Sequence, residues 1–221
     1  SHTFEFPLRQ AGTYWYHSHT GLQEQRGVYG AIVIEPKAGV RIKTDHDAVM
    51  LLSDWTNEHP NEVMRTLMRG SDWYAIRKGT AQSIFGAAQS GFLKEYFDRE
   101  KARLPAMDVS DVAYDAFLIN GQRGTRIEGK PGERVRLRLI NASAATYHYI
   151  TSSAGPLTIV AADGPAVEPV KVNRFLMAIA ETYDVIITIP ASGQYELRAT
   201  AQDGSGHVSA TFGSGRSEEH T

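Results

Sequence analysis

The chain has 221 residues, of which 42% are hydrophobic and 22% charged, so it can bury a hydrophobic core and is neither disordered nor fibrous. The 23 Lys and Arg residues nearly balance 25 Asp and Glu residues without forming a basic block, which argues against nucleic acid as a partner. No run of about 18 apolar residues is present, so no membrane span is expected. Cysteine is absent, so any metal must bind through His, Met or carboxylate side chains.

Strand patterns dominate both ends of the chain. Short runs rich in aromatic and β-branched residues alternate with turn signals such as Asn120-Gly121 and Asp203-Gly204. This spacing favours an antiparallel sandwich or a Greek-key barrel over a parallel α/β sheet. The predicted strands span residues 13–19, 30–34, 48–54, 117–120, 134–141, 157–161, 176–180, 183–189, 194–199 and 208–212.

The run from Arg134 to Asn141 has the clearest alternation in the sequence. Valine and leucine occupy every second position, and arginine occupies the positions between them at 134, 136 and 138. This is the two-residue period of a strand with one buried and one solvated face. We therefore expect the three arginines to face water.

The middle of the chain has a helical pattern. We expect a helical insertion between strands, over residues 58–105, with Asn61 as a candidate cap of its first helix. Two apolar stripes at helical spacing support it: Val63, Met64, Leu67 and Met68, then Phe92, Leu93, Tyr96 and Phe97.

Two histidines separated by one residue are the most informative feature. His17 and His19 lie in an aromatic strand-like segment, where residues i and i+2 share one face with Cα atoms about 6.5 to 7 Å apart. Two imidazoles at that spacing can each hold one member of a close metal pair. The triplet is weak alone, because a chain with eight histidines often contains one by chance, but buried imidazoles need partners for their ring nitrogens. Imidazole suits copper, zinc, iron and nickel, and the residues do not choose among them.

Residues 12–36, GTYWYHSHTGLQEQRGVYGAIVIEP, resemble the second histidine motif in the first cupredoxin domain of multicopper oxidases. Four later segments are similar to the second cupredoxin domain of the copper-resistance protein A family, a periplasmic branch. The resemblance covers nearly the whole chain. These segments are residues 114–121 (YDAFLING), 130–138 (KPGERVRLR), 161–164 (AADG) and 180–185 (AETYDV).

The resemblance implies an all-β, cupredoxin-like Greek-key β-sandwich or barrel with a helical insertion. Residues 1–36 would be the C-terminal strands of a truncated first domain, 37–46 a connector, and 47–213 a second domain. The remaining tail, residues 214–221, abruptly replaces the continuation expected after Gly213. It matches one translation frame of a common sequencing-library adapter, so we exclude it, with His220, from the fold and the site.

The resemblance also implies a role for the two histidines. In the family, these positions ligate the two type 3 coppers, one each, within a trinuclear cluster that reduces dioxygen to water with four electrons from a substrate. The implied partners are dioxygen, a reducing substrate such as Cu(I) or phenols, and missing domains of the same polypeptide, with a role in periplasmic copper resistance. The other ligands, including the type 1 copper cysteine, would come from those domains. The chain alone is therefore expected to be inactive.

Two alternatives remain at this point. A copper-binding or scaffold cupredoxin module would use the same histidines to sequester metal without oxidase turnover. A relative of two-domain nitrite reductases would need type 1 copper ligands inside this domain, and no cysteine supplies them. A downstream His-Cys-His segment followed by Met would favour the oxidase.

Several other residues are of types that can bind metal or act as acids and bases, but we expect them to serve the fold or to lie on the surface. Met64 and Met68 are expected to pack. His148 lacks a second ligand at strand spacing, and the remaining histidines are expected in loops or on the surface. The structural group is Met64, Met68, Asp54, Trp55, Glu181 and Asp184, and the surface group is His46, His59 and His207.

Overall fold

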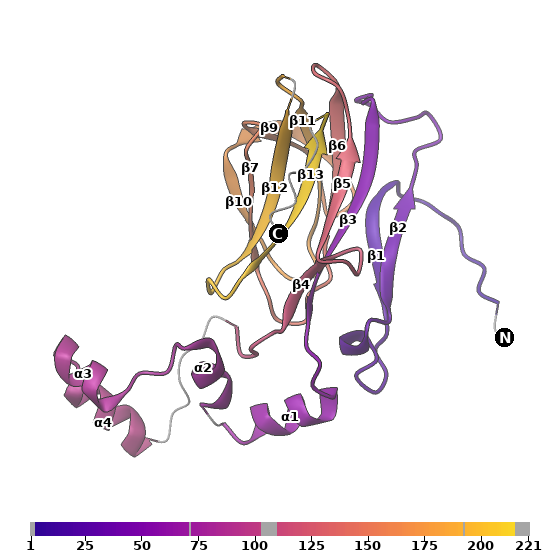
Figure 1. Cartoon of the computed structure of the whole chain (residues 1–221). Coiled ribbons are helices and arrows are strands. Elements are labelled where there is room, and N and C mark those ends of the chain that lie inside the picture. Colours follow the sequence, from indigo (N-terminus) through magenta and orange to yellow (C-terminus); the bar gives the residue numbers. More distant parts are fainter. Residues whose placement is uncertain (1–2, 71, 103–109, 192, 215–221) are drawn as a thin grey trace.

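The computed structural model describes residues 3–70, 72–102, 110–191 and 193–214, and the predicted adapter-derived tail lies outside them except for Ser214. Strands are the main regular structure of the described chain (Figure 1). The strands are β1 (Gly12–His17), β2 (Tyr29–Ile34), β3 (His46–Trp55), β4 (Ala116–Ile119), β5 (Gly124–Glu128), β6 (Arg134–Asn141), β7 (His148–Ser152), β8 (Leu157–Ala162), β9 (Ala166–Val172), β10 (Arg174–Met177), β11 (Thr182–Thr188), β12 (Gln194–Ala201) and β13 (His207–Gly213).

Two sheets make a sandwich, and the β1–β2 hairpin forms a separate two-stranded sheet beside it. One sheet has the order β4-β3-β6-β11-β8-β9 and the other β10-β7-β12-β13-β5. The predicted all-β sandwich is confirmed, and the sheets do not close into a barrel. Most strand pairs are antiparallel, as the favoured antiparallel sandwich predicts, but β3 pairs with β6 and β5 with β13 in parallel. Long stretches of chain separate the members of both pairs, as parallel crossovers require.

The hydrophobic core lies between the two sheets. Leu137 and Val185 from the six-stranded sheet and Ile150 and Phe212 from the five-stranded sheet belong to one buried cluster. Their inward direction follows from the two-residue period of the strands, which sends alternate side chains to the same face. This core is built entirely by residues downstream of β2.

The outer face of β6 differs from the prediction. Arg134 is exposed as expected, but Arg136 and Arg138 are each only 5% exposed. The hairpin and the segment that follows it cover this face: Arg138 donates to Thr13 of β1, and Arg136 donates to the carbonyl oxygen of Ile42. Alternation identifies the two faces of a strand but does not show what packs on either, so the predicted solvated face was wrong.

Among the residues described between β3 and β4, four short helices are present: α1 (Pro60–Met68), α2 (Trp73–Lys78), α3 (Ile84–Ser90) and α4 (Leu93–Ala102). They lie at one end of the sandwich, with α3 and α4 farthest from it (Figure 1). The cap of α1 is His59, whose Nδ1 accepts a hydrogen bond from the backbone N–H of Asn61, so the capping role expected for Asn61 is wrong. The predicted helical insertion runs to residue 105, and its last residues lie outside the described ranges.

One buried ion pair fixes α2 to the sandwich. Lys78 at the end of α2 contacts Asp203, which lies between β12 and β13, and also donates to the backbone oxygen of Ser110. By contrast, Phe85 of α3 is 87% exposed and Met68 of α1 is 81% exposed. The expected packing role is therefore wrong for Met68, because most of its side chain is exposed to solvent.

The hairpin contacts the sandwich at a point where two backbones nearly touch. A Cβ atom at Gly12 of β1 would lie 2.2 Å from the carbonyl oxygen of Gly164, and one at Gly164 would lie 2.4 Å from the ring of Tyr14. Both glycines have positive φ angles, +147° and +101°, which other residues rarely adopt.

Within the described residues, no helix is long and apolar enough to cross a membrane.

Candidate metal centre

The two predicted metal ligands lie side by side at the end of β1. The ring of His17 stacks on Trp15 with centroids 4.3 Å apart and planes 13° apart. The ring centroid of His19 is 4.5 Å from that of His17, at an interplanar angle of 38°. Extended backbone therefore sends Trp15, His17 and His19 to one side, as the i, i+2 spacing predicted.

The turn after His19 is held by hydrogen bonds near its base. The backbone N–H of Ser18 donates to the carbonyl of Val28, which extends the pairing of the hairpin past His17. The hydroxyl of Ser18 donates to Gln23 Oε1 at 2.7 Å, and the N–H of Thr20 donates to that hydroxyl. These bonds fix the backbone on both sides of His19 relative to β2.

Glu24 is a site residue that the sequence interpretation missed. It begins the 3₁₀ helix η1 (Glu24–Arg26), and its Oε2 lies 3.0 Å from Nδ1 of His17. The oxygen is at hydrogen-bond distance but away from the direction of a ring N–H, and Nδ1 is shielded from solvent without a hydrogen-bond partner. No sequence signal marked Glu24, because it lies seven positions after His17 and meets it only when the loop folds back.

The histidine pair is an incomplete metal site. Within the described ranges, no three His, Cys, Asp or Glu side chains gather closely enough to hold an ion. His17 is partly buried, with 29% of its side chain exposed, and His19 is exposed. Imidazole nitrogen is a good donor to copper, zinc, iron or nickel, so the donor type fits copper while the number of donors does not satisfy one.

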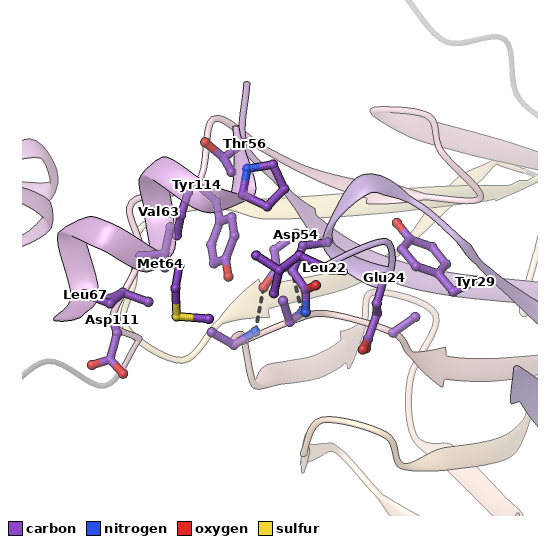
Figure 2. Close-up of a pocket in the computed structure, with 16 residues that line it drawn as sticks. Leu22, Glu24, Tyr29, Asp54, Thr56, Val63, Met64, Leu67, Asp111 and Tyr114 are labelled. Atoms are coloured by element: carbon purple, nitrogen blue, oxygen red, sulfur yellow. Dashed lines mark hydrogen bonds between the residues drawn. The ribbon is translucent and has the colours of Figure 1, made fainter. Parts of the chain in front are cut away.

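A cavity of about 260 Å³ lies behind the loop, between η1, α1 and the end of β3 (Figure 2). Its lining includes Glu24, Tyr29, Met64 and Tyr114, and Asp54 at its base.

Burial raises the pKa of Asp54, while hydrogen bonds to its carboxylate oppose that shift. The donors are the backbone N–H groups of Ala144, Ala145 and Thr146 and the hydroxyl of Thr146. These bonds support the structural role expected for Asp54.

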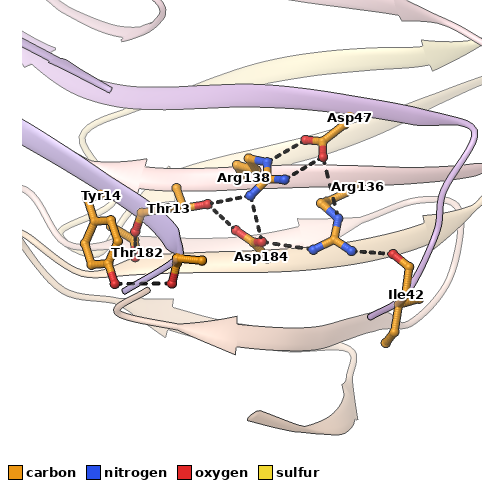
Figure 3. Close-up of polar contacts among 9 residues, drawn as sticks. Thr13, Tyr14, Ile42, Asp47, Arg136, Arg138, Thr182 and Asp184 are labelled. Carbon is orange, nitrogen blue, oxygen red and sulfur yellow. Dashed lines mark hydrogen bonds and ion pairs between the residues drawn. The ribbon is translucent and has the colours of Figure 1, made fainter. Parts of the chain in front are cut away.

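A charged network joins the hairpin to the six-stranded sheet (Figure 3). Asp184 Oδ1 accepts a 2.6 Å bond from the hydroxyl of Thr13, and its Oδ2 accepts bonds from Arg136 and Arg138 at 3.1 and 3.2 Å. Arg138 also makes a two-bond pair with Asp47 at 2.6 and 2.7 Å. The interactions support the structural role expected for Asp184, and Glu181 likewise bonds the backbone N–H of Ala178.

The four other histidines that the structure describes do not join the pair in a metal-binding cluster. His148 is fully buried in β7, with Ser143 Oγ 3.1 Å from its Nε2, and burial lowers its pKa to about 4. His46 starts β3 and pairs with Glu133 at 2.8 Å. His59 caps α1, and His207 is exposed at the start of β13.

Comparisons with known proteins agree with these features. Residues 46–217 match a family model described as multicopper oxidase, and residues 1–39 match a second multicopper oxidase model. The chain therefore belongs to the multicopper oxidase family.

Within the family, the chain is similar to copper resistance proteins. It is 40% identical to copper resistance protein A of Escherichia coli and to that of Pseudomonas syringae pv. tomato, in each case over 96% of this chain and 36% of the relative. The chain thus spans about a third of the length of these relatives. It is 31% identical to multicopper oxidase MmcO of Mycobacterium tuberculosis, over 90% of this chain and 38% of that protein.

Solved structures show the same fold. A laccase from Botrytis aclada superposes with a TM-score of 0.67 at 21% identity, covering 96% of this chain and 36% of that one. The blue copper oxidase from Nitrosomonas europaea superposes with a TM-score of 0.62 at 24% identity, covering 94% and 57%.

Proposed function

We propose that His17 and His19 each hold one copper of a type 3 pair, as part of an oxygen-reducing centre that other parts of a longer polypeptide complete. The observation that carries the proposal is the pair of imidazole rings with centroids 4.5 Å apart, in a chain of the multicopper oxidase family. The absence of a third nearby ligand among the described residues supports completion from elsewhere.

The proposed reaction couples oxidation of Cu(I) or phenol-like donors to reduction of dioxygen. When bound, the copper centre supplies the redox chemistry: four one-electron donors and four protons convert one O₂ into two water molecules. The similarity to copper resistance protein A supports a role in copper resistance, and we place the protein in the periplasm with that branch. The type 1 copper cysteine would come from outside this chain, which has no cysteine.

The residues of this chain would position the metals. Stacking on Trp15 restricts rotation of the His17 ring, and the Ser18–Gln23 bond restrains the loop that carries His19. Ligands held in place before a metal arrives bind it more tightly than mobile ones. Sequestration of copper without turnover is the rival function. Both functions use the same two histidines, so the incomplete ligand set does not separate them.

Copper titration of the chain tests the ligands. The double variant His17→Ala/His19→Ala is expected to lose the tightest copper uptake of the chain, measured by competition with a chromophoric chelator. The matched control is His59→Asn/His207→Gln, which removes two imidazoles elsewhere and keeps a good capping residue at position 59. Equal uptake by the chain and the His17/His19 variant would refute the proposal.

Oxygen consumption separates oxidase from sequestration. With copper and a phenol donor, the chain alone is expected to consume no oxygen above free copper, whereas a polypeptide extended to the length of the relatives should do so. If the extended polypeptide binds copper through the same histidines and still does not reduce oxygen, the sequestration function is favoured.

A further inference from the structure

We propose that Glu24 is a positioning residue that fixes the neutral tautomer of His17, with the proton on Nδ1 and the lone pair on Nε2. The inference rests on the proposed function, because it says which nitrogen of His17 is available to copper. The evidence is the 3.0 Å separation between Glu24 Oε2 and His17 Nδ1.

The electrostatics of that contact select one tautomer. An ionised carboxylate has only acceptor oxygens, and a neutral imidazole has one N–H donor and one lone-pair acceptor. A lone pair on Nδ1 would be repelled by the carboxylate charge 3.0 Å away, whereas the positive end of an N–H there is attracted to it. The oxygen lies off the N–H direction, so the contact acts through charge; a linear hydrogen bond would require the ring to turn about its terminal side-chain torsion, which is a broad energy well.

Solvent cannot replace Glu24 in this role. Nδ1 of His17 is shielded from water and has no hydrogen-bond partner in the described structure, so an N–H placed there has Glu24 as its nearby charged acceptor. A buried N–H without an acceptor costs about 1 to 3 kcal/mol. Stacking on Trp15, with planes only 13° apart, limits the ways in which the ring can turn from Glu24.

The position of Glu24 is itself restrained. Glu24 is the first residue of η1. In this turn the N–H of Gly27 donates to the carbonyl oxygen of Glu24, and the N–H of Arg26 donates to the carbonyl oxygen of Gln23. Only about a fifth of its side chain is exposed. The carboxylate is thus presented to His17 by a short helical turn and not by a freely moving loop.

The tautomer can be measured in the metal-free chain by long-range ¹H–¹⁵N correlation spectra, at about pH 8.5, where neutral imidazoles predominate. The His17 signals are assigned by their loss in His17→Ala. We expect protonated Nδ1 in the chain and in Glu24→Gln, whose amide oxygen still accepts, and a mixture of tautomers in Glu24→Ala. Gln25→Ala, which changes the next residue, is the matched control and should keep protonated Nδ1.

Protonated Nε2 in the unmodified chain, or the same tautomer in Glu24→Ala as in the chain, would overturn the inference. The measurement contains no copper, so its result is independent of whether His17 binds one. Equal copper uptake by the His17→Ala/His19→Ala variant would refute the proposed function while leaving the tautomer result intact.

Discussion

Individual side chains show both what the sequence could predict and what it could not. The direction of His17 and His19 followed from the two-residue strand period, because that period depends on local backbone geometry alone. The contact of His17 with Glu24 did not follow, because it depends on how η1 folds back over the end of β1. Local periodicity therefore found the candidate ligands and not the group that holds one of them.

His148 gives a prediction about pH. Its pKa of about 4 in the folded chain lies below the ordinary value of 6.5, so between these values the unfolded chain binds a proton that the folded chain does not. Stability from this group is complete above pH 6.5 and declines as pH falls toward 4, by about 3 kcal/mol in total. Burial is the cause, since the ring lies inside the sandwich against Phe117.

Urea unfolding at pH 7.5 and 4.5 measures this loss. The decrease in unfolding free energy between the two values is expected to be smaller in His148→Gln than in the unmodified chain. His207→Gln, which changes an exposed histidine, should behave like the unmodified chain. An equal decrease in all three proteins would contradict the assignment.

At the scale of elements, strands were predictable where one pattern dominated and not where polar residues interrupted it. Ten predicted strands correspond to strands of the structure, with shifts of a few residues at their ends. The strands β5, β7 and β9 were not predicted. β9 contains Glu168, Pro169 and Lys171, and it lies at the edge of its sheet, where proline and charges are tolerated.

The β1–β2 hairpin is held to the sandwich by Asp184 and its partners. In Asp184→Ala, the guanidinium groups of Arg136 and Arg138 keep only Asp47 as a carboxylate partner among the described residues, and Thr13 loses its acceptor. Removing one member of a buried ion pair costs about 3 to 5 kcal/mol. Hydrogen exchange should therefore accelerate in β1 and β2 more than in β12 and β13.

The exposed pair Arg41–Glu168 provides the control for that experiment. Its two side chains are mostly exposed and 3.8 Å apart, so Glu168→Ala should change the unfolding free energy by no more than about 0.5 kcal/mol. If Asp184→Ala exchanges its β1 amides as slowly as Glu168→Ala does, the charged network does not hold the hairpin.

The whole molecule exposes surface that a compact monomer usually buries. The β1–β2 sheet has two strands only, and the face that carries Tyr16 and Ile32 is exposed. Unpaired strand edges and apolar faces pair readily with other chains. We therefore expect the isolated chain to be poorly soluble.

Sedimentation of the chain across micromolar concentrations tests this expectation. Self-association is predicted for the unmodified chain, and Ile32→Lys, which places a charge on the exposed face of β2, should reduce it. Thr200→Lys, a substitution in β12 away from the hairpin, is the control. A single monomeric species of the unmodified chain at all concentrations would contradict the prediction.

The close passage of Gly12 over Gly164 limits how the two parts could be recombined. A methyl group at either glycine would clash with the opposite segment, so the hairpin and the turn after β8 are in direct contact there. A chimaera that joins this hairpin to the sandwich of another multicopper oxidase would need a glycine at both positions. Exchange of whole units between relatives is therefore constrained by two residues that carry no side chain at all.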